Sequence, residues 1–170
     1  SSFYCCNSLA SVVIPSSVTS VGDQTFYYCY SLASAVIPSN VTSIGHKTFY
    51  YCYSLASVVI PDSVTSIGGE AFYNCYSLTS VVIPSGVTDL EKYSFYYCCS
   101  LTAVVIPDSV TSIGINVFYG CQGMVYYDFS SHESVPTLSN TNAFNNIPSD
   151  CKIVVPDSLY DTWIAATNWS

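Results

Sequence analysis

The stretch "SLASVVIPDSVTSIGGEAFYNCYSL", Ser54–Leu78, decides the fold, because nearly the same residues recur on both sides of it. Aligning Leu32–Ser54 with Leu55–Ser77 gives 16 identities in 23 positions. A fixed period of this length is the signature of a repeat array, in which each unit packs mainly against its neighbours. We therefore expect one solenoid rather than one globular core.

Three residue types mark the repeat at intervals of 23 along the chain. They are the columns Phe3, Phe26, Phe49, Phe72, Phe95 and Phe118; Cys6, Cys29, Cys52, Cys75, Cys98 and Cys121; and Pro15, Pro38, Pro61, Pro84 and Pro107. Residues 1–121 thus hold five full repeats after a partial one, followed by diverged coils over 122–156 and a capping helix over 157–170.

The alternation inside "LASVVIP" predicts a short β-strand at the start of each repeat. Leu55, Val58 and Ile60 would point inward, while Ser57 and Val59 point outward. The proline that follows cannot donate to a strand ladder and ends the strand. We expect seven parallel strands in one ladder, near 9–14, 32–37, 55–60, 78–83, 101–106, 124–129 and 151–155.

The rest of the repeat returns the chain to its starting point. In "DSVTSIGG", Val64 and Ile67 point back into the core before Gly68 turns the chain. The next residues, "EAFYNC", are typical of a short helical or 3₁₀ turn that buries Phe72 and Cys75. One repeat is therefore one coil.

This pattern resembles the 23-residue leucine-rich repeat of the BspA-like (Treponema pallidum type) class, from Phe3 to Cys121. The resemblance rests on Leu55, Val58, Ile60, Pro61, Val64, Ile67, Gly68, Phe72 and Cys75. It implies a solenoid of right-handed coils, with a parallel sheet of about seven short strands and 3₁₀ or helical turns opposite.

The C-terminal residues predict further coils and a cap. Phe144 and Pro156 repeat the Phe-to-Pro spacing, which predicts Ile153 and Val155 inward. The Leu, Val and Ile positions of the coil before them are occupied by Met124, Tyr127 and Phe129.

The ending "VPDSLYDTWIAATNW" is similar to the helical closure of such arrays in surface proteins of gut bacteria and in some phage-tail proteins. Ser158 with Asp161 suggests a capping box, and Leu159, Trp163 and Ala166 share one helical face. No comparable segment guards the N-terminal end, so we expect an exposed sheet edge there, in a piece of a longer protein.

Composition excludes several classes of function. With three Lys, no Arg and a formal charge of −8, the chain lacks the basic surface that binds nucleic acid. Every apolar run is interrupted well before the roughly 18 residues of a membrane span. His46 and His132 are the only histidines, and neither lies in a catalytic motif. We expect no enzyme activity and no cofactor, and we expect the variable pair His46 and Lys47 to be solvated turn positions.

The nine cysteines have three interpretations. Six form one structural column, Cys6 to Cys121, spaced by about one strand separation of 4.8 Å. Zinc sites need clustered C-x₂₋₄-C pairs, which this chain lacks. We interpret the column as buried, inert thiols, with disulfides within the column or a metal site as alternatives. Cys99 replaces a tyrosine of the repeat and is the expected exposed thiol.

Two sets of surface residues are candidates for binding. Tyrosines suit recognition because they present large amphipathic faces with few rotors. Alternatively, these rings only stack on one another and shield the turn. The outward valines form an apolar stripe of a kind that monomers usually avoid. The candidate binding residues are Tyr30, Tyr53 and Tyr76 together with Val36, Val59 and Val82.

The resemblance implies a non-enzymatic, extracellular adhesion scaffold, the repeat domain of a bacterial cell-surface protein that binds a host protein or glycan. Three alternatives remain: a phage-tail receptor-binding segment, a filament subunit in which coils stack end to end or self-associate, and an accessory domain of an enzyme.

Overall fold

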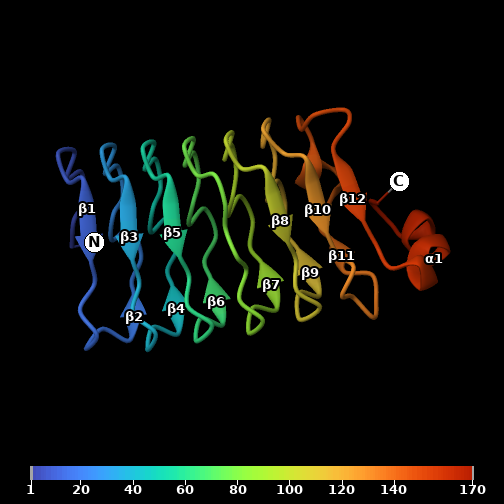
Figure 1. Ribbon diagram of the computed structural model, residues 1–170, viewed down its shortest axis with the longest axis horizontal. Helices are drawn as coiled ribbons and strands as arrows, with labels where there is room; N and C mark the ends of the chain where they lie inside the picture. Colours follow the sequence, from blue (N-terminus) through green and yellow to red (C-terminus); the bar gives the residue numbers. More distant parts are fainter. Residues whose placement is uncertain (1, 170) are drawn as a thin grey trace.

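The computed structural model describes residues 2–169 as a stack of coils along one long axis (Figure 1). We number the coils from the leucine that begins each repeat: coil 1 is 9–31, coil 2 is 32–54, coil 3 is 55–77, coil 4 is 78–100, coil 5 is 101–123, coil 6 is 124–150, and coil 7 begins at 151. Each coil contributes a short segment to two lateral faces and a turn on a third side.

Two series of parallel strands run along the stack. The first series is β1 (Ser11–Val13), β3 (Ser34–Val36), β5 (Ser57–Val59), β8 (Ala103–Val105), β10 (Tyr126–Asp128) and β12 (Lys152–Val154). The second is β2 (Ser20–Val21), β4 (Ser43–Ile44), β6 (Ser66–Ile67), β7 (Asp89–Leu90), β9 (Ser112–Ile113) and β11 (Thr137–Leu138).

Pairing follows the repeat. Ser11 lies opposite Ser34, and Ser34 lies opposite Ser57, so the register advances by one repeat per strand. All pairs are parallel. The solenoid with parallel sheets that the sequence predicted is confirmed.

The prediction of one continuous seven-stranded ladder is wrong. The first series forms two separate sheets, β1-β3-β5 and β8-β10-β12, because the segment near 78–83 forms no strand. The second series is likewise split into β2-β4-β6 and β7-β9-β11. Glu91 stands in coil 4 where coils 2, 3 and 5 have a glycine packed closely on the preceding coil, and a side chain at this position excludes the same close approach.

The core consists of the inward columns. The Phe rings of successive coils stack with centroids 5.3–5.5 Å apart from Phe26 to Phe118. Met124, Tyr127 and Phe129 are buried, so coil 6 continues the core as the pattern predicted. Ile153 takes the inward register that the pattern predicted, although its side chain is 39% exposed. It pairs with buried Tyr127, but as part of the edge strand β12 it has no strand beyond it.

On the turn side, two residues per coil adopt a left-handed backbone conformation, and they form two columns along the stack. One column holds Gln24, Lys47, Glu70, Tyr93 and Asn116, and the other Cys5, Tyr28, Tyr51, Asn74, Tyr97, Gly120 and Asn146, with φ between +54° and +76°. Each such residue interrupts a run of i→i+3 turns, so a regular 3₁₀ helix forms on this side only at η1 (Thr141–Phe144) within residues 2–169.

A short helix follows the last coil. The segment consists of η2 (Asp157–Leu159) and α1 (Tyr160–Ala165). The N-cap of α1 is Leu159, without a side-chain hydrogen bond, so the predicted capping box of Ser158 and Asp161 is wrong. The 3₁₀ turn η2 takes up Ser158 and moves the helix start beyond it. Buried Trp163 packs on Phe129, with ring centroids 5.3 Å apart. Within residues 2–169, no helix is long and apolar enough to cross a membrane.

Candidate interaction surface

An apolar stripe runs along the first strand series. Side chains alternate across a strand, so burial of Val58 and Ile60 places Val59 on the outside. We call the outward valines Val13, Val36, Val59, Val82 and Val105 the valine stripe; each is between 52% and 75% exposed.

The residues two positions before the stripe valines carry no charge over coils 1–5. They are Ser11, Ser34, Ser57, Ser80 and Ala103. In coil 6, Asp128 takes the valine position and ends the stripe, although Val125 and Tyr126 remain exposed nearby. The stripe is thus an uncharged, apolar face with a defined end.

The candidate tyrosines stack on one another. The ring centroids of Tyr30 and Tyr53 are 5.1 Å apart, with an angle of 11° between the ring planes. Those of Tyr53 and Tyr76 are 5.0 Å apart, with an angle of 6°. We call these three residues the tyrosine ladder. Tyr53 has a ladder neighbour on both ring faces, whereas the terminal rings Tyr30 and Tyr76 each have one and are exposed. The alternative that the rings stack is therefore realised in the geometry, and a binding role would fall on the edges and hydroxyls.

A second, longer ladder lies beside the first. Its rings stack at 4.6–5.2 Å along the whole turn side: Tyr4, Tyr27, Tyr50, Tyr73, Tyr96 and Tyr119. Burial raises the pKa of Tyr73 to about 12, with the neighbouring phenols adding to the effect. Burial likewise raises the pKa values of Tyr27 and Tyr50. These phenols stay neutral well above physiological pH.

The cysteine column lies in the core, apart from its first member. Cys29, Cys52, Cys75, Cys98 and Cys121 are buried, and Cys6 is half-buried. Each of the five buried thiols donates to the carbonyl oxygen of a Phe 26 residues earlier, at 3.0–3.3 Å. Burial raises the pKa of all five, that of Cys121 to about 12. All nine cysteines are free thiols.

The expectation that Cys99 is the exposed thiol is wrong. Cys99 is half-buried, because its side chain is shorter than that of the tyrosine it replaces, and burial raises its pKa. Its Sγ lies 3.6 Å from the carbonyl oxygen of Gly120. The exposed thiol is Cys5, in a left-handed turn position.

The two histidines lie in different environments. His132 is buried beside Phe129 and Trp163, with Nε2 3.3 Å from the carbonyl oxygen of Val110. The Nε2 of His46 lies 3.8 Å from Oε1 of Glu70, and the Nζ of Lys47 lies 3.4 Å from Oε2 of the same carboxylate. Both residues lie in the turn as predicted, and their side chains are partly exposed, at 39% for His46 and 26% for Lys47. In the described part of the chain, no three His, Cys, Asp or Glu side chains are grouped to hold a metal ion.

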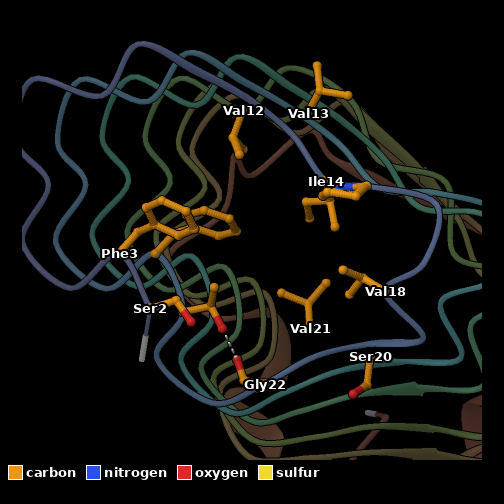
Figure 2. Close-up of a pocket in the computed structure, with 12 residues that line it drawn as sticks. Ser2, Phe3, Val12, Val13, Ile14, Val18, Ser20, Val21 and Gly22 are labelled. Carbon is orange, nitrogen blue, oxygen red and sulfur yellow. Dashed lines mark hydrogen bonds between the residues drawn. The ribbon is translucent and has the colours of Figure 1, made fainter.

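The N-terminal end of the stack presents an apolar hollow of about 220 Å³. Figure 2 shows Phe3, Val12, Ile14, Val18 and Val21 around it, viewed with the following coils behind. Equivalent side chains in coils 2–5 are covered by the neighbouring coil. The expected exposed edge is present at β1, the outer strand of its sheet.

Comparison with known proteins identifies a family to which the sequence is similar. The sequence matches the BspA type leucine rich repeat region in six copies, over residues 1–125 and 89–162. No curated protein matches the chain.

Solved structures share the fold. A leucine-rich repeat protein of T. pallidum is 27% identical with a TM-score of 0.68, over 91% of this chain and 81% of that one. A leucine-rich cell surface protein of Faecalibacterium prausnitzii is 24% identical with a TM-score of 0.56, over 98% and 65%. The pneumococcal vaccine antigen PcpA is 18% identical with a TM-score of 0.76, over 93% and 39%.

Proposed function

Because this chain belongs to the BspA-type leucine-rich repeat family, a family of repeat binding scaffolds, we propose that it is a non-enzymatic, extracellular module of a bacterial cell-surface protein and binds a host protein. Similarity to the leucine-rich cell surface protein of Faecalibacterium prausnitzii supports this location. The match covers about two thirds of that protein. Attachment of this chain to a cell is therefore proposed, together with its binding role.

The valine stripe carries the proposal. Five valines at least half exposed, one per coil and without a charged neighbour in their strands, form a contiguous apolar surface. Large exposed apolar patches on otherwise polar proteins mark interaction sites. A protein partner can bury such a stripe, and the tyrosine ladder at the corner of the same coils would supply hydroxyl groups at the rim.

A protein suits this surface better than a glycan. Sugars are held by the open faces of aromatic rings, and stacking at 5.0–5.1 Å covers both faces of Tyr53 and one face each of Tyr30 and Tyr76. The valines offer no hydrogen-bonding group to a sugar. The apolar area and the ring edges instead match the centre and rim of a protein interface.

The test uses the fluorescently labelled chain on cultured intestinal epithelial cells. Mild protease treatment of the cells should abolish binding, whereas glycosidase treatment should leave it unchanged. If glycosidases remove binding and protease does not, the ligand is a glycan and the proposed partner class is wrong. A heat-unfolded sample of the same chain is the control for nonspecific adhesion.

The filament alternative is less well supported. End-to-end stacking needs two open ends, and α1 with Trp163 and Trp169 packs on Phe129 at the C-terminal end. A second copy could stack there only after this segment had moved. No observation favours the phage-tail alternative over a bacterial surface protein.

A further inference from the structure

One coil boundary is built differently from its neighbours. Thr42, Thr65, Thr111 and Thr137 each donate a backbone N–H to the threonine of the preceding coil at 2.9–3.0 Å. No such bond joins Thr88 to Thr65 in the described structure. The same difference occurs just after the second-series strand of each coil. There the backbone N–H groups of Gly45, Gly68 and Gly114 donate to a carbonyl oxygen of the preceding coil at 2.7–2.8 Å, whereas that of Glu91 does not. The second strand series is therefore open between coils 3 and 4.

The first strand series is loosened at the same coil. The backbone bonds from Ala33 to Ala10 and from Ala56 to Ala33 are 2.8 and 3.0 Å long. The equivalent bond from Thr79 to Ala56, between coils 3 and 4, is 3.2 Å long, and the bond from Thr102 to Thr79, between coils 4 and 5, is 3.4 Å long. The segment 80–82 forms no strand, which Figure 1 shows as the bare coil between β5 and β8. The first series is therefore interrupted on both sides of coil 4, whereas the second series is intact between coils 4 and 5. The boundary between coils 3 and 4 is the one at which both lateral faces are interrupted.

A single substitution in the repeat explains the opening. A Cβ on Gly45 would lie 2.6 Å from the backbone nitrogen of Asp23, and one on Gly68 would lie 2.6 Å from that of His46. Glycine is therefore required where a coil touches the preceding one. Coil 4 has Glu91 in this column, and its Cβ excludes the same close approach.

The carboxylate of Glu91 fills part of the gap between coils 3 and 4. Its Oε2 accepts a hydrogen bond from the backbone N–H of Gly69 at 2.7 Å. A Cβ on Gly69 would lie 3.2 Å from this oxygen, so the glycine in coil 3 and the glutamate in coil 4 fit as a pair. A polar hollow of about 130 Å³ remains, lined by Thr65, Ser66, Ile67, Thr88, Asp89 and Glu91.

The turn side of this boundary is intact. Phe72 donates to Ser94 and Asn74 donates to Tyr96, both at 2.8 Å, as in the other coils. The rings of Phe72 and Phe95 stack at 5.3 Å, which is the normal spacing of the column. The boundary is consequently bonded along one edge and open along the two faces away from it.

We propose that this boundary, which we call the seam, is a hinge about which coils 1–3 and coils 4–7 move as two blocks. The bonded turn side is the pivot, and the unpaired backbone groups of Thr88 and Glu91 lie in the part that opens. The valine stripe crosses the seam between Val59 and Val82, so opening changes the spacing of the two halves of the stripe. The hinge itself does not depend on what the stripe binds.

Hydrogen exchange resolved at single amides tests the hinge. Amides without a hydrogen-bond partner in a mobile boundary exchange fast, whereas ladder amides of packed coils are protected. We expect Thr88 and Glu91 to exchange at least about tenfold faster than Thr65, Gly68 and their equivalents in coil 5. Equal protection of Thr88 and Thr111 would overturn the proposal.

The second experiment restores the glycine that the other coils have at the position of Glu91. Glu91→Gly should close the seam and slow exchange at Thr88 by about tenfold or more, to the level of Thr111. Glu133→Gly, which removes an exposed glutamate elsewhere, is the matched control and should leave Thr88 unchanged. A folded Glu91→Gly protein with unaltered exchange at Thr88 would show that Glu91 is not the cause.

A distance measurement separates a moving hinge from a fixed gap. Spin labels carried by unnatural amino acids at Ser39 and Ser85 span the seam, and labels at Ser16 and Asp62 span two coils of one block in the same column. The cross-seam pair should give the broader distance distribution, and Glu91→Gly should narrow it. Equally narrow distributions in the original protein would mean a rigid boundary.

Discussion

At the residue scale, the turn side depends on residues that the repeat consensus does not mark as special. Lys47, Tyr51 and Glu70 all adopt φ near +60°, a region that non-glycine residues enter at a cost of about 1–2 kcal/mol. Only the asparagines and Gly120 in these columns are typical of such a conformation. The sequence therefore held little signal for these positions, and stacking between coils compensates for their strain.

Relief of this strain is measurable at Gln24. Gln24→Gly removes the left-handed penalty at a turn position with φ of 54° and should raise the free energy of unfolding by about 0.5–1 kcal/mol. Gln122→Gly, at an exposed position without positive φ, should lower it by about 0.5–1 kcal/mol. Urea unfolding of both variants checks the pair, and equal effects would mean that the backbone at Gln24 is not strained.

Thiol reactivity should follow burial. In the native protein at pH 8, a maleimide should label Cys5 first and Cys99 more slowly, because burial raises the pKa of Cys99. The buried members of the column, such as Cys75 and Cys98, should react only on unfolding. Peptide mapping by mass spectrometry gives the order. Labelling of Cys75 as fast as Cys5 would contradict the packing of the column.

Stability should fall in alkali. The folded pKa of Tyr73 is raised from 10.0 to about 12, so between these values the folded protein holds a proton that the unfolded chain has lost. This contribution is fully present below pH 10 and disappears as the pH rises through about 12. The buried thiol of Cys121, raised from 9.0 to about 12, acts in the same direction. Thermal midpoints should be flat from pH 7 to 9 and then decline, and a rise above pH 10 would show the opposite linkage.

At the scale of single elements, the C-terminal helix shows how capping was misassigned. Ser158 makes no cap to α1, whereas Asn140 accepts a hydrogen bond from the N–H of Asn142 at the start of η1, at 3.0 Å. Asn140→Ala should therefore cost about 0.5–2 kcal/mol of unfolding free energy, and Ser158→Ala should cost little. Chemical denaturation of the two variants compares them directly. A larger loss for Ser158→Ala would restore the capping box.

The first strand series was predictable and the second was not. Three alternating residues, two positions before a proline, mark β1, β3 and β5, and the inward residues are those that the alternation selected. The second-series strands are two residues long, too short for any period to show. The split at coil 4 did have a signal, since Glu91 breaks the glycine column, but its effect depends on a backbone contact that only the fold reveals.

At the scale of the whole molecule, the two ends of the described array are built differently. The aromatic cluster of Phe129, Trp163 and Trp169 covers the last coils, while Phe3 and Val12 line the hollow at the other end. Between them, packing occupies the inward columns and leaves the outward columns free to vary. The valine stripe was predictable for this reason, because alternation alone places Val59 outside. The stacking of Tyr53 on its neighbours was predicted only as an alternative, since repeat spacing does not set ring orientation.

The most direct test of the account is whether the valine stripe is the binding surface. Val59→Lys with Val82→Lys should lower the affinity of the labelled chain for epithelial cells by about tenfold or more, while the thermal midpoint stays nearly unchanged. Thr42→Lys with Thr111→Lys places the same charges on the other strand series and is the matched control, expected to bind like the original protein. Unchanged binding by the valine variant, or equal loss by both variants, would contradict the assignment of the binding surface to the valine stripe.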